Sequence, residues 1–283
     1  MYRAFNLTNL EDLEELQNID SLEAQKEYEE RKEEVTQNLS IAKILKSSTY
    51  AQEDHEKIKI NADEIQKRIF PTYKDYDIFL SHSHKDLALV QKFAYYLTHK
   101  MRVRVFIDSE VWGYVDDLLK QVNDKYALKE KNLYDYKIAN IDACNIYLML
   151  SNAIHDVINE TECLFFINTP NSINIDSNIE LQNVESPWLY DELKTTSMIK
   201  KRIPDSIQGY LDGLAACRKR NKIYTDSIEP KWVRDVHKEI DGLTILPNEI
   251  LLKWQNKIDT SYYPGEETSP MRDFYSVLHE NDI

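Results

Sequence analysis

Glycine is scarce in this chain of 283 residues, and its placement excludes two large classes of nucleotide-binding protein. The five glycines are Gly113, Gly209, Gly213, Gly242 and Gly265. No two of them stand in the spacing GxGxxG or GxxxxGK[ST]. The phosphate loops of Rossmann dinucleotide folds and of P-loop ATPases need such glycines, because the backbone there approaches the phosphates closely. We therefore expect neither kind of loop.

Cysteine and long apolar runs are also lacking. Cys144, Cys163 and Cys217 are odd in number and far apart, and no CxxC or Cys/His spacing indicates zinc. Free thiols in a reducing compartment are the expectation. No apolar stretch is long enough to span a bilayer, and the acidic start of the chain has no apolar signal core. These features predict a soluble, cytoplasmic protein with no metal site.

Positive charge is in the minority, with 35 Lys and Arg against 49 Asp and Glu and a formal net charge of −14. Sequence-independent binding to nucleic acid or to an anionic membrane needs a basic face, so neither partner is expected. The densest basic runs, at 200–202 and 218–220, are typical of solvated helix faces.

Residues 1 to about 70 are rich in helix-forming Leu, Glu, Gln, Lys and Ala. Leu10, Leu13 and Leu16 recur at helical spacing. The heptads are not sustained over several repeats, which favours a helical hairpin packed on the main domain over a coiled coil that joins subunits. Pro71 ends this region, so a helical N-terminal extension is predicted over residues 1–70.

A strand–helix–strand unit follows. The run "YDIFLS" at 76–81 predicts a buried strand, and "KDLALVQKFAYYLTHK" predicts an amphipathic helix. A second strand, "VRVFID" at 103–108, ends in an acid. Such a unit implies a parallel sheet with a right-handed crossover. Ligands bind beyond the carboxyl ends of parallel strands, where residues 81–84 and 108–110 stand.

The remaining segments complete an α/β pattern. Residues 113–160 are mostly helical in character, and "CLFFINT" at 163–169 predicts a third, fully buried strand. A further helix is predicted to begin with Ser186 as N-cap and Pro187 at its first position. The main domain is expected over 71–260, followed by a C-terminal tail at 261–283 that is partly loop.

Taken in order, these pieces resemble a TIR domain (Toll/interleukin-1 receptor type). The resemblance rests on "YDIFLSHSHKD", "VRVFID", "AIHDVINETECLFFINTPNSI" and "SPWLYDEL", and it spans roughly residues 73–200. The family's S-x-W-x-x-x-E-L pattern is met in register by Ser186, Trp188, Glu192 and Leu193. About thirty residues near 113–145 are extra and form a helical insertion. The resemblance implies a flavodoxin-like TIR fold, with a central parallel sheet flanked by helices.

The resemblance also implies chemistry. Many TIR domains cleave NAD+ at the nicotinamide–ribose bond, with the glutamate of that motif as catalytic residue, which is Glu192 here. Independently of the family, nicotinamide is a cationic leaving group that needs no general acid, and a carboxylate beside the ribose stabilises the oxocarbenium-like transition state. The products are ADP-ribose, if water attacks, or a cyclic ADP-ribose isomer. For Glu192 the alternative interpretation is an acid near a helix N-terminus, stabilised by the helix dipole.

Substrate contacts are expected from residues at the strand ends and beside the glutamate. They are Ser81, His82, Ser83, Asp108, Trp112 and Trp188. Trp188 lies one helical turn before Glu192 and shares its face; its alternative role is a core anchor. His82 and His84 share one face of an extended segment, but no third metal ligand is near in sequence. A Ser-His-Asp hydrolase lacks its G-x-S-x-G elbow.

Two functions from different classes follow. The first is an NAD+-consuming hydrolase or cyclase that takes NAD+ as substrate and needs no cofactor, similar to the bacterial, Thoeris-like TIR proteins of anti-phage defence. Such an enzyme is expected to form a homo-oligomer through TIR–TIR contacts and to signal to a separate effector protein. The second is a non-catalytic TIR adaptor that acts through assembly alone.

Overall fold

The computed structural model describes residues 1–37, 40–51, 58–70, 75–131, 133–176, 181–204, 234–260 and 269–283. The chain forms two compact units. Unit 1 comprises Met1–Glu27, Lys74–Ile107 and Ile158–Ile283, and unit 2 comprises Tyr28–Tyr73 and Asp108–Val157. The boundary between Glu27 and Tyr28 falls inside residues 1–70, which the sequence predicts to be one N-terminal extension. The first 27 residues therefore belong to the unit that contains the main sheet.

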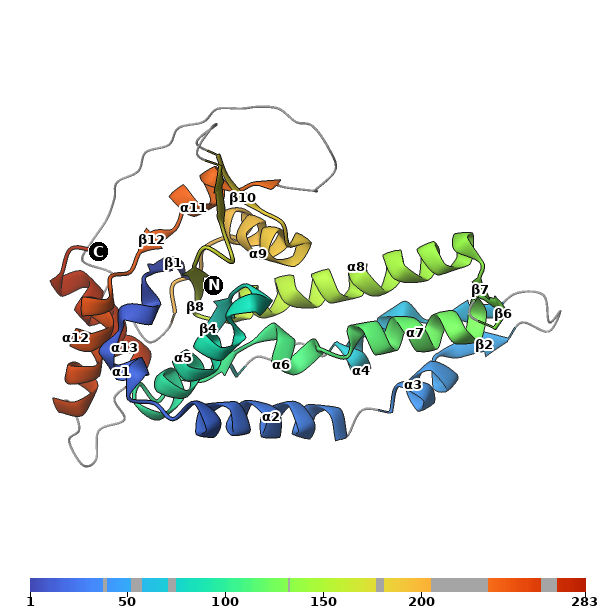
Figure 1. Ribbon diagram of the computed structural model, residues 1–283, viewed down its shortest axis with the longest axis horizontal. Helices are drawn as coiled ribbons and strands as arrows, with labels where there is room; N and C mark the ends of the chain where they lie inside the picture. Colours follow the sequence, from blue (N-terminus) through green and yellow to red (C-terminus); the bar gives the residue numbers. More distant parts are fainter. Residues whose placement is uncertain are drawn as a thin grey trace. The chain divides into compact units, whose positions relative to one another are not determined.

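Unit 1 is an α/β structure around a parallel sheet of five strands, in the order β12-β1-β8-β4-β5 (Figure 1). The strands are β1 (Arg3–Thr8), β4 (Ile78–Ser81), β5 (Val105–Phe106), β8 (Cys163–Asn168) and β12 (Thr244–Ile245). Helices flank the sheet, and every pairing in it is parallel. The predicted α/β class with a central parallel sheet is therefore confirmed, as are strands within 76–81 and 163–169.

The strand order contains one departure from expectation. In a flavodoxin-like sheet the spatial order is 2-1-3-4-5. Here β5, β4 and β8 take the places of strands 2, 1 and 3, but the fourth place is taken by β1. The prediction that residues 1–70 are helical is wrong at Arg3–Thr8, and also at the short strands Thr49–Ala51 and Ile58–Ile60. The six residues "RAFNLT" are inserted between β8 and β12 and supply a central strand.

Packing explains why β1 can take an interior place. Phe5 and Leu7 are fully buried, and Asn6 between them is also buried, as expected for a strand covered on both faces. The Phe5 ring contacts Phe165 of β8 edge-on, with centroids 5.6 Å apart, and it contacts Phe274 at 5.3 Å. The N-terminal strand thus brings a large aromatic side chain into the centre of the core.

The helices of unit 1 are α1 (Glu14–Gln17), α5 (Leu87–His99), α9 (Pro187–Met198), α11 (His237–Asp241), α12 (Asn248–Thr260) and α13 (Pro270–Glu280), with 3-10 turns η1 (Leu10–Asp12) and η2 (His84–Asp86). Two of these helices, α5 and α9, begin and end close to where the sequence predicts. A small antiparallel sheet adds β9 (Asn174–Asp176), β10 (Leu181–Val184) and β11 (Arg234–Asp235).

The C-terminal segment is more than a partly looped tail. Helix α13 places Phe274 against Trp254 of α12, with ring centroids 4.6 Å apart, and the indole Nε1 of Trp254 donates to the carbonyl of Pro270 at 2.9 Å. Phe274 is fully buried. The end of the chain therefore forms part of the core of unit 1.

Unit 2 combines the rest of the expected extension with the expected insertion. It contains most of α2 (Ser21–Gln37) and of α8 (Tyr136–Glu160), together with α3 (Ile41–Ser47), α4 (Ala62–Ile69), α6 (Asp108–Trp112) and α7 (Val115–Tyr126). Two hairpins complete it: β2 (Thr49–Ala51) with β3 (Ile58–Ile60), and β6 (Leu128–Glu130) with β7 (Leu133–Tyr134). The two segments pack together although the β4–α5–β5 unit separates them in sequence.

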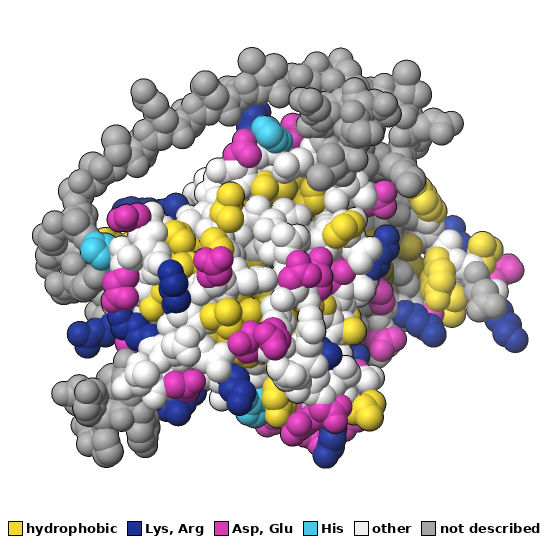
Figure 2. Space-filling view, turned by 60° about the vertical axis from the view of Figure 1, so that its left-hand side comes forward, with side chains coloured by type: hydrophobic (Ala, Val, Ile, Leu, Met, Phe, Trp, Pro, Cys, Tyr) yellow, Lys and Arg dark blue, Asp and Glu magenta, His cyan; other side chains and the backbone are white. Residues whose placement is uncertain are grey.

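Three further sequence features have a structural counterpart. Cys144 and Cys163 are free thiols, whereas Cys217 and the basic run 218–220 lie outside the described residues. In the face shown in Figure 2, Lys and Arg are interspersed with Asp and Glu among the described residues. Within the described ranges, no helix has both the length and the apolar character needed to cross a bilayer.

Replacement of Phe5 tests whether β1 is structurally central. We expect Phe5→Ala to lower the free energy of unfolding by about 3–5 kcal/mol, because the change empties a fully buried aromatic site. The matched control is Leu22→Ala in the same N-terminal region, whose side chain is 75% exposed, and its effect should stay within about 0.5 kcal/mol. Urea unfolding followed by circular dichroism measures both; equal midpoints for the two variants would contradict the fold.

Candidate functional site

A buried hydrogen bond at the carboxyl edge of the sheet joins Ser81 and Glu192. Ser81 is the last residue of β4, and its Oγ donates a hydrogen bond of 2.6 Å to Oε2 of Glu192 on α9. The residues are 111 positions apart in sequence, and both are buried, with Glu192 only 3% exposed. The fold thus brings together two of the residues that the sequence singles out.

Local sequence determines how α9 presents this glutamate. The Ser186 side chain accepts a hydrogen bond from the backbone N–H of Leu189 at 3.3 Å, and Pro187 occupies the first turn, which confirms the predicted cap. No acidic residue lies in that first turn. Glu192 stands farther along the helix, and the dipole effect fades beyond the first turn. A helix-dipole explanation for this acid is therefore weak.

Contacts with α11 and β11 hold α9 in place. Lys194 donates to Oε1 of Glu239 at 2.8 Å, and this hydrogen bond raises the pKa of the lysine. The guanidinium of Arg234 lies over the ring of Tyr190, 5.1 Å from its centroid. Glu192 is therefore carried by a helix that is anchored on residues on either side of it.

In the loop after β4, Ser83 and His82 have different structural roles. Ser83 caps the η2 turn, because its Oγ accepts from the N–H of Lys85 at 3.3 Å. His82 is 7% exposed, and its Nδ1 lies 3.2 Å from the carbonyl oxygen of Leu80. A carbonyl can only accept, so Nδ1 carries the hydrogen in this contact. The turn is capped by the serine, and the histidine ring is packed beside the strand end.

A second polar cluster, missed by the sequence reasoning, ties the loops after β4 and β8 together. Asp86 accepts from Oγ1 of Thr169 at 2.5 Å and from Nδ2 of Asn171 at 2.6 Å. Oγ1 of Thr169 in turn accepts from the backbone N–H groups of Asn171 and Ser172. The sequence signal for this cluster was the "TPNS" turn after the third predicted strand, but the partner of Thr169, Asp86, lies 83 residues away in the chain. Asp86 thus fixes the loop after β8 against the loop after β4, next to the strand end that carries Ser81.

The other predicted contacts are distributed between the units. Trp188 is half-buried and stands one turn before Glu192 on α9. Asp108 and Trp112 are the first and last residues of α6, in unit 2. Trp112 is 2% exposed and meets Phe70 edge-on at 6.3 Å, so it is a core residue of unit 2. A substrate contact for Asp108 or Trp112 stays a prediction.

The chemistry available at this edge is that of a buried carboxylate. Among the described residues, no three His, Cys, Asp or Glu side chains cluster as metal ligands would. A carboxylate held away from water interacts strongly with a positive charge that develops beside it. The Ser81 hydroxyl holds Oε2 of Glu192 in one orientation, which is the preorganisation that such stabilisation needs.

The Ser81–Glu192 bond makes a prediction for stability. Ser81→Ala should cost about 1–3 kcal/mol, because it removes the donor from a buried carboxylate oxygen. The control variant Ser197→Ala removes an exposed hydroxyl of α9, and its effect should stay within about 0.5 kcal/mol. Chemical unfolding of the wild type and the two variants measures the difference. Equal unfolding midpoints for the two variants would contradict a buried Ser81–Glu192 bond.

Comparison of the chain with known proteins finds no match: no family model, no curated protein and no solved structure matches it.

Proposed function

We propose that this protein cleaves NAD+ at the nicotinamide–ribose bond and releases nicotinamide together with ADP-ribose or a cyclic ADP-ribose isomer. The observation that carries the proposal is the buried carboxylate of Glu192, hydrogen-bonded to Ser81 at the carboxyl end of β4. That edge of a parallel sheet is where ligands bind in α/β folds. The resemblance of "YDIFLSHSHKD" and "SPWLYDEL" to TIR domains supplies the substrate class.

In the proposed reaction, the bond between the ribose anomeric carbon and the pyridinium nitrogen breaks. Its electron pair leaves with nicotinamide, which becomes neutral, so no acid is required. The positive charge passes to the ribose, and the Glu192 carboxylate stabilises it. Attack by water, with loss of a proton, yields ADP-ribose; attack by a nucleophile of the same molecule, such as the adenine ring or a ribose hydroxyl, yields a cyclic isomer.

Side chains near Glu192 are suited to hold the substrate. The aromatic face of Trp188 can stack on a nicotinamide or adenine ring, and the Ser83–Asp86 turn offers polar groups for the ribose or the phosphates. The biological setting that fits is anti-phage defence in the cytoplasm, with the product as a signal to a separate effector.

A second candidate, assembly without catalysis, is favoured by one surface feature of unit 2. Ile141 and Leu148 are 52% and 60% exposed, and Cys144 between them is exposed as well. Their spacing of three and four residues places them on one face of α8. An apolar stripe of this kind is suited to contact with a second copy of the chain.

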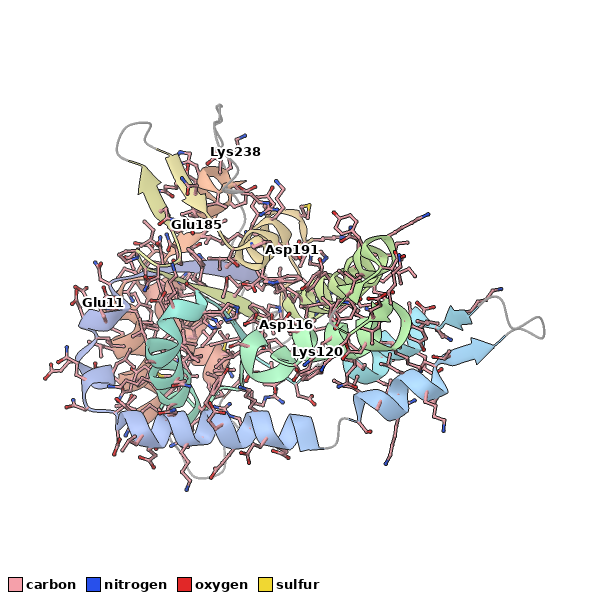
Figure 3. All side chains as sticks on the ribbon, turned by 45° about the vertical axis from the view of Figure 1, so that its right-hand side comes forward. Glu11, Asp116, Lys120, Glu185, Asp191 and Lys238 are labelled. Atoms are coloured by element: carbon pink, nitrogen blue, oxygen red, sulfur yellow. The ribbon has the colours of Figure 1, made fainter. Side chains whose placement is uncertain are left out.

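The catalytic assignment predicts the behaviour of Glu192→Gln. The substitution keeps the shape of the side chain and removes its charge, so nicotinamide release should fall by about 100-fold or more. Chromatography of NAD+ reactions with concentrated protein measures the products. The matched control is Asp191→Asn, which removes a neighbouring charge on α9 (Figure 3) and should retain activity.

Two results would overturn this assignment. If the concentrated wild-type protein releases no nicotinamide, the enzymatic proposal fails. If Glu192→Gln releases it as fast as Asp191→Asn, catalysis depends on another residue.

The assembly candidate predicts a change in molar mass. If copies associate through the stripe on α8, light scattering of the wild type should show a mass that rises with concentration. Leu148→Glu should abolish the rise, because it places a charge in the apolar contact. Leu22→Glu, which alters an exposed leucine on α2, is the control. A monomer at all concentrations would exclude self-assembly by this route.

A further inference from the structure

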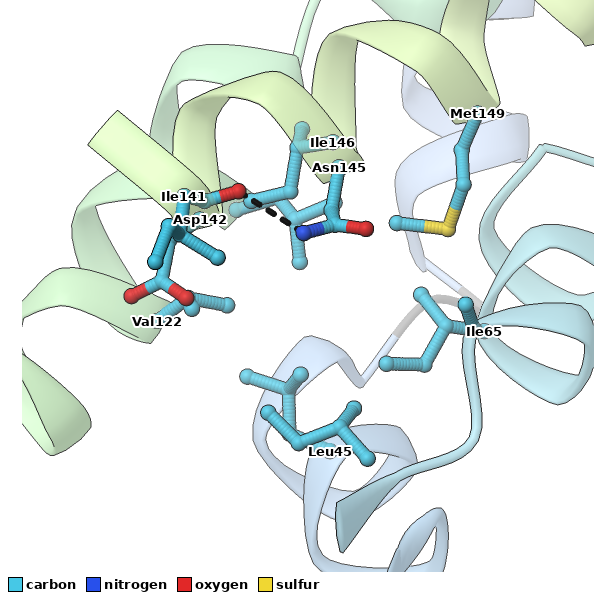
Figure 4. Close-up of a pocket in the computed structure, with 11 residues that line it drawn as sticks. Leu45, Ile65, Val122, Ile141, Asp142, Asn145, Ile146 and Met149 are labelled. Atoms are coloured by element: carbon cyan, nitrogen blue, oxygen red, sulfur yellow. Dashed lines mark hydrogen bonds between the residues drawn. The ribbon is translucent and has the colours of Figure 1, made fainter. Parts of the chain in front are cut away.

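Unit 2 contains a cavity of about 230 Å³ that the proposed NAD+ chemistry does not use. Its walls come from β3, α3, α4, α7 and α8, and they are formed by aliphatic side chains and Met149, apart from Asp142 and Asn145 (Figure 4). Among the described residues that line it, Asp142 is the single titratable one. The site is therefore an apolar chamber with one acid.

The two polar residues both offer oxygen to the cavity. Asp142 and Asn145 are three residues apart on α8, so they are neighbours on one face. Oδ2 of Asp142 is buried and has no hydrogen-bond partner among the described residues. The Asn145 amide donates through Nδ2 to the carbonyl of Ile141 at 2.8 Å, which leaves its oxygen, turned toward Met149 in Figure 4, as an acceptor.

An acid in this setting favours a cationic partner. Burial raises the pKa of the Asp142 carboxyl, which reflects the cost of keeping its charge away from water. A ligand ammonium would remove that cost by a charge-assisted hydrogen bond. The aliphatic walls would at the same time cover the hydrocarbon part of the ligand. The buried carboxylate and the aliphatic walls together favour one chemical class of ligand, an amine with an apolar body.

We propose that this cavity binds a small primary amine with an apolar body, its ammonium group on Asp142 and its hydrocarbon among the side chains of α4 and α7. The volume is smaller than the roughly 300–1,000 Å³ of sites for drug-sized ligands. An arylalkylamine or a short branched alkylamine fits such a chamber. The site is independent of Glu192, and its occupancy does not rest on NAD+ cleavage.

The test compares 2-phenylethylamine with 2-phenylethanol, which matches it in size and shape but is neutral, by isothermal titration calorimetry on the full chain. The amine should bind at least about tenfold more tightly. Asp142→Asn should reduce the affinity for the amine to that for the alcohol. Glu130→Gln, which removes an exposed acid of unit 2 outside the cavity, should leave the difference unchanged.

A filling variant tests the location. Ala62 is an exposed residue at the start of α4 that borders the cavity, and Ala62→Leu should weaken both ligands without touching the acid. Circular dichroism establishes that each variant is folded. The proposal is overturned if neither compound binds saturably, if both bind equally, or if Asp142→Asn keeps the preference for the amine.

Discussion

The parallel pairing of β8 on both of its edges is the constraint on which unit 1 depends. Residues Cys163–Asn168 pair with β1 along their whole length and with β4 at four positions. The Phe165 ring meets Phe5 of β1, Phe93 of α5 and Phe274 of α13. One strand thereby joins the beginning, the middle and the end of the chain, and the loop that follows it reaches the candidate site through Thr169.

The candidate site shows how burial and polarity are reconciled at this edge. Glu192 and Asp86 are both withdrawn from water, and each receives hydroxyl hydrogen bonds, from Ser81 and Thr169 respectively. Buried carboxylates are costly unless they are paired or hydrogen-bonded. Two such acids near the ends of adjacent strands are the physical ground for proposing chemistry at this edge.

Much of unit 1 could be predicted from sequence because its signals are local. The apolar runs of β4 and β8 and the Ser186–Pro187 start of α9 depend on neighbouring residues alone. Strand β1 was not predicted, since "RAFNLT" is only six residues long and precedes a helix-forming segment. The Asp86 cluster was missed for a related reason: its partners come from separate loops. The resemblance to TIR domains pointed to Glu192, which is a buried carboxylate in the structure, whereas its catalytic role is still a prediction.

The central position of β1 has a consequence for how the protein is made. Arg3 pairs with Cys163 and Phe5 with Thr244, so one edge of β1 has no partner until β8 has been synthesised, and the other has none until β12 has been. Contacts between such distant residues slow folding, and a nascent strand without neighbours exposes apolar surface. The first strand of the chain is therefore among the last to complete its pairing in the sheet.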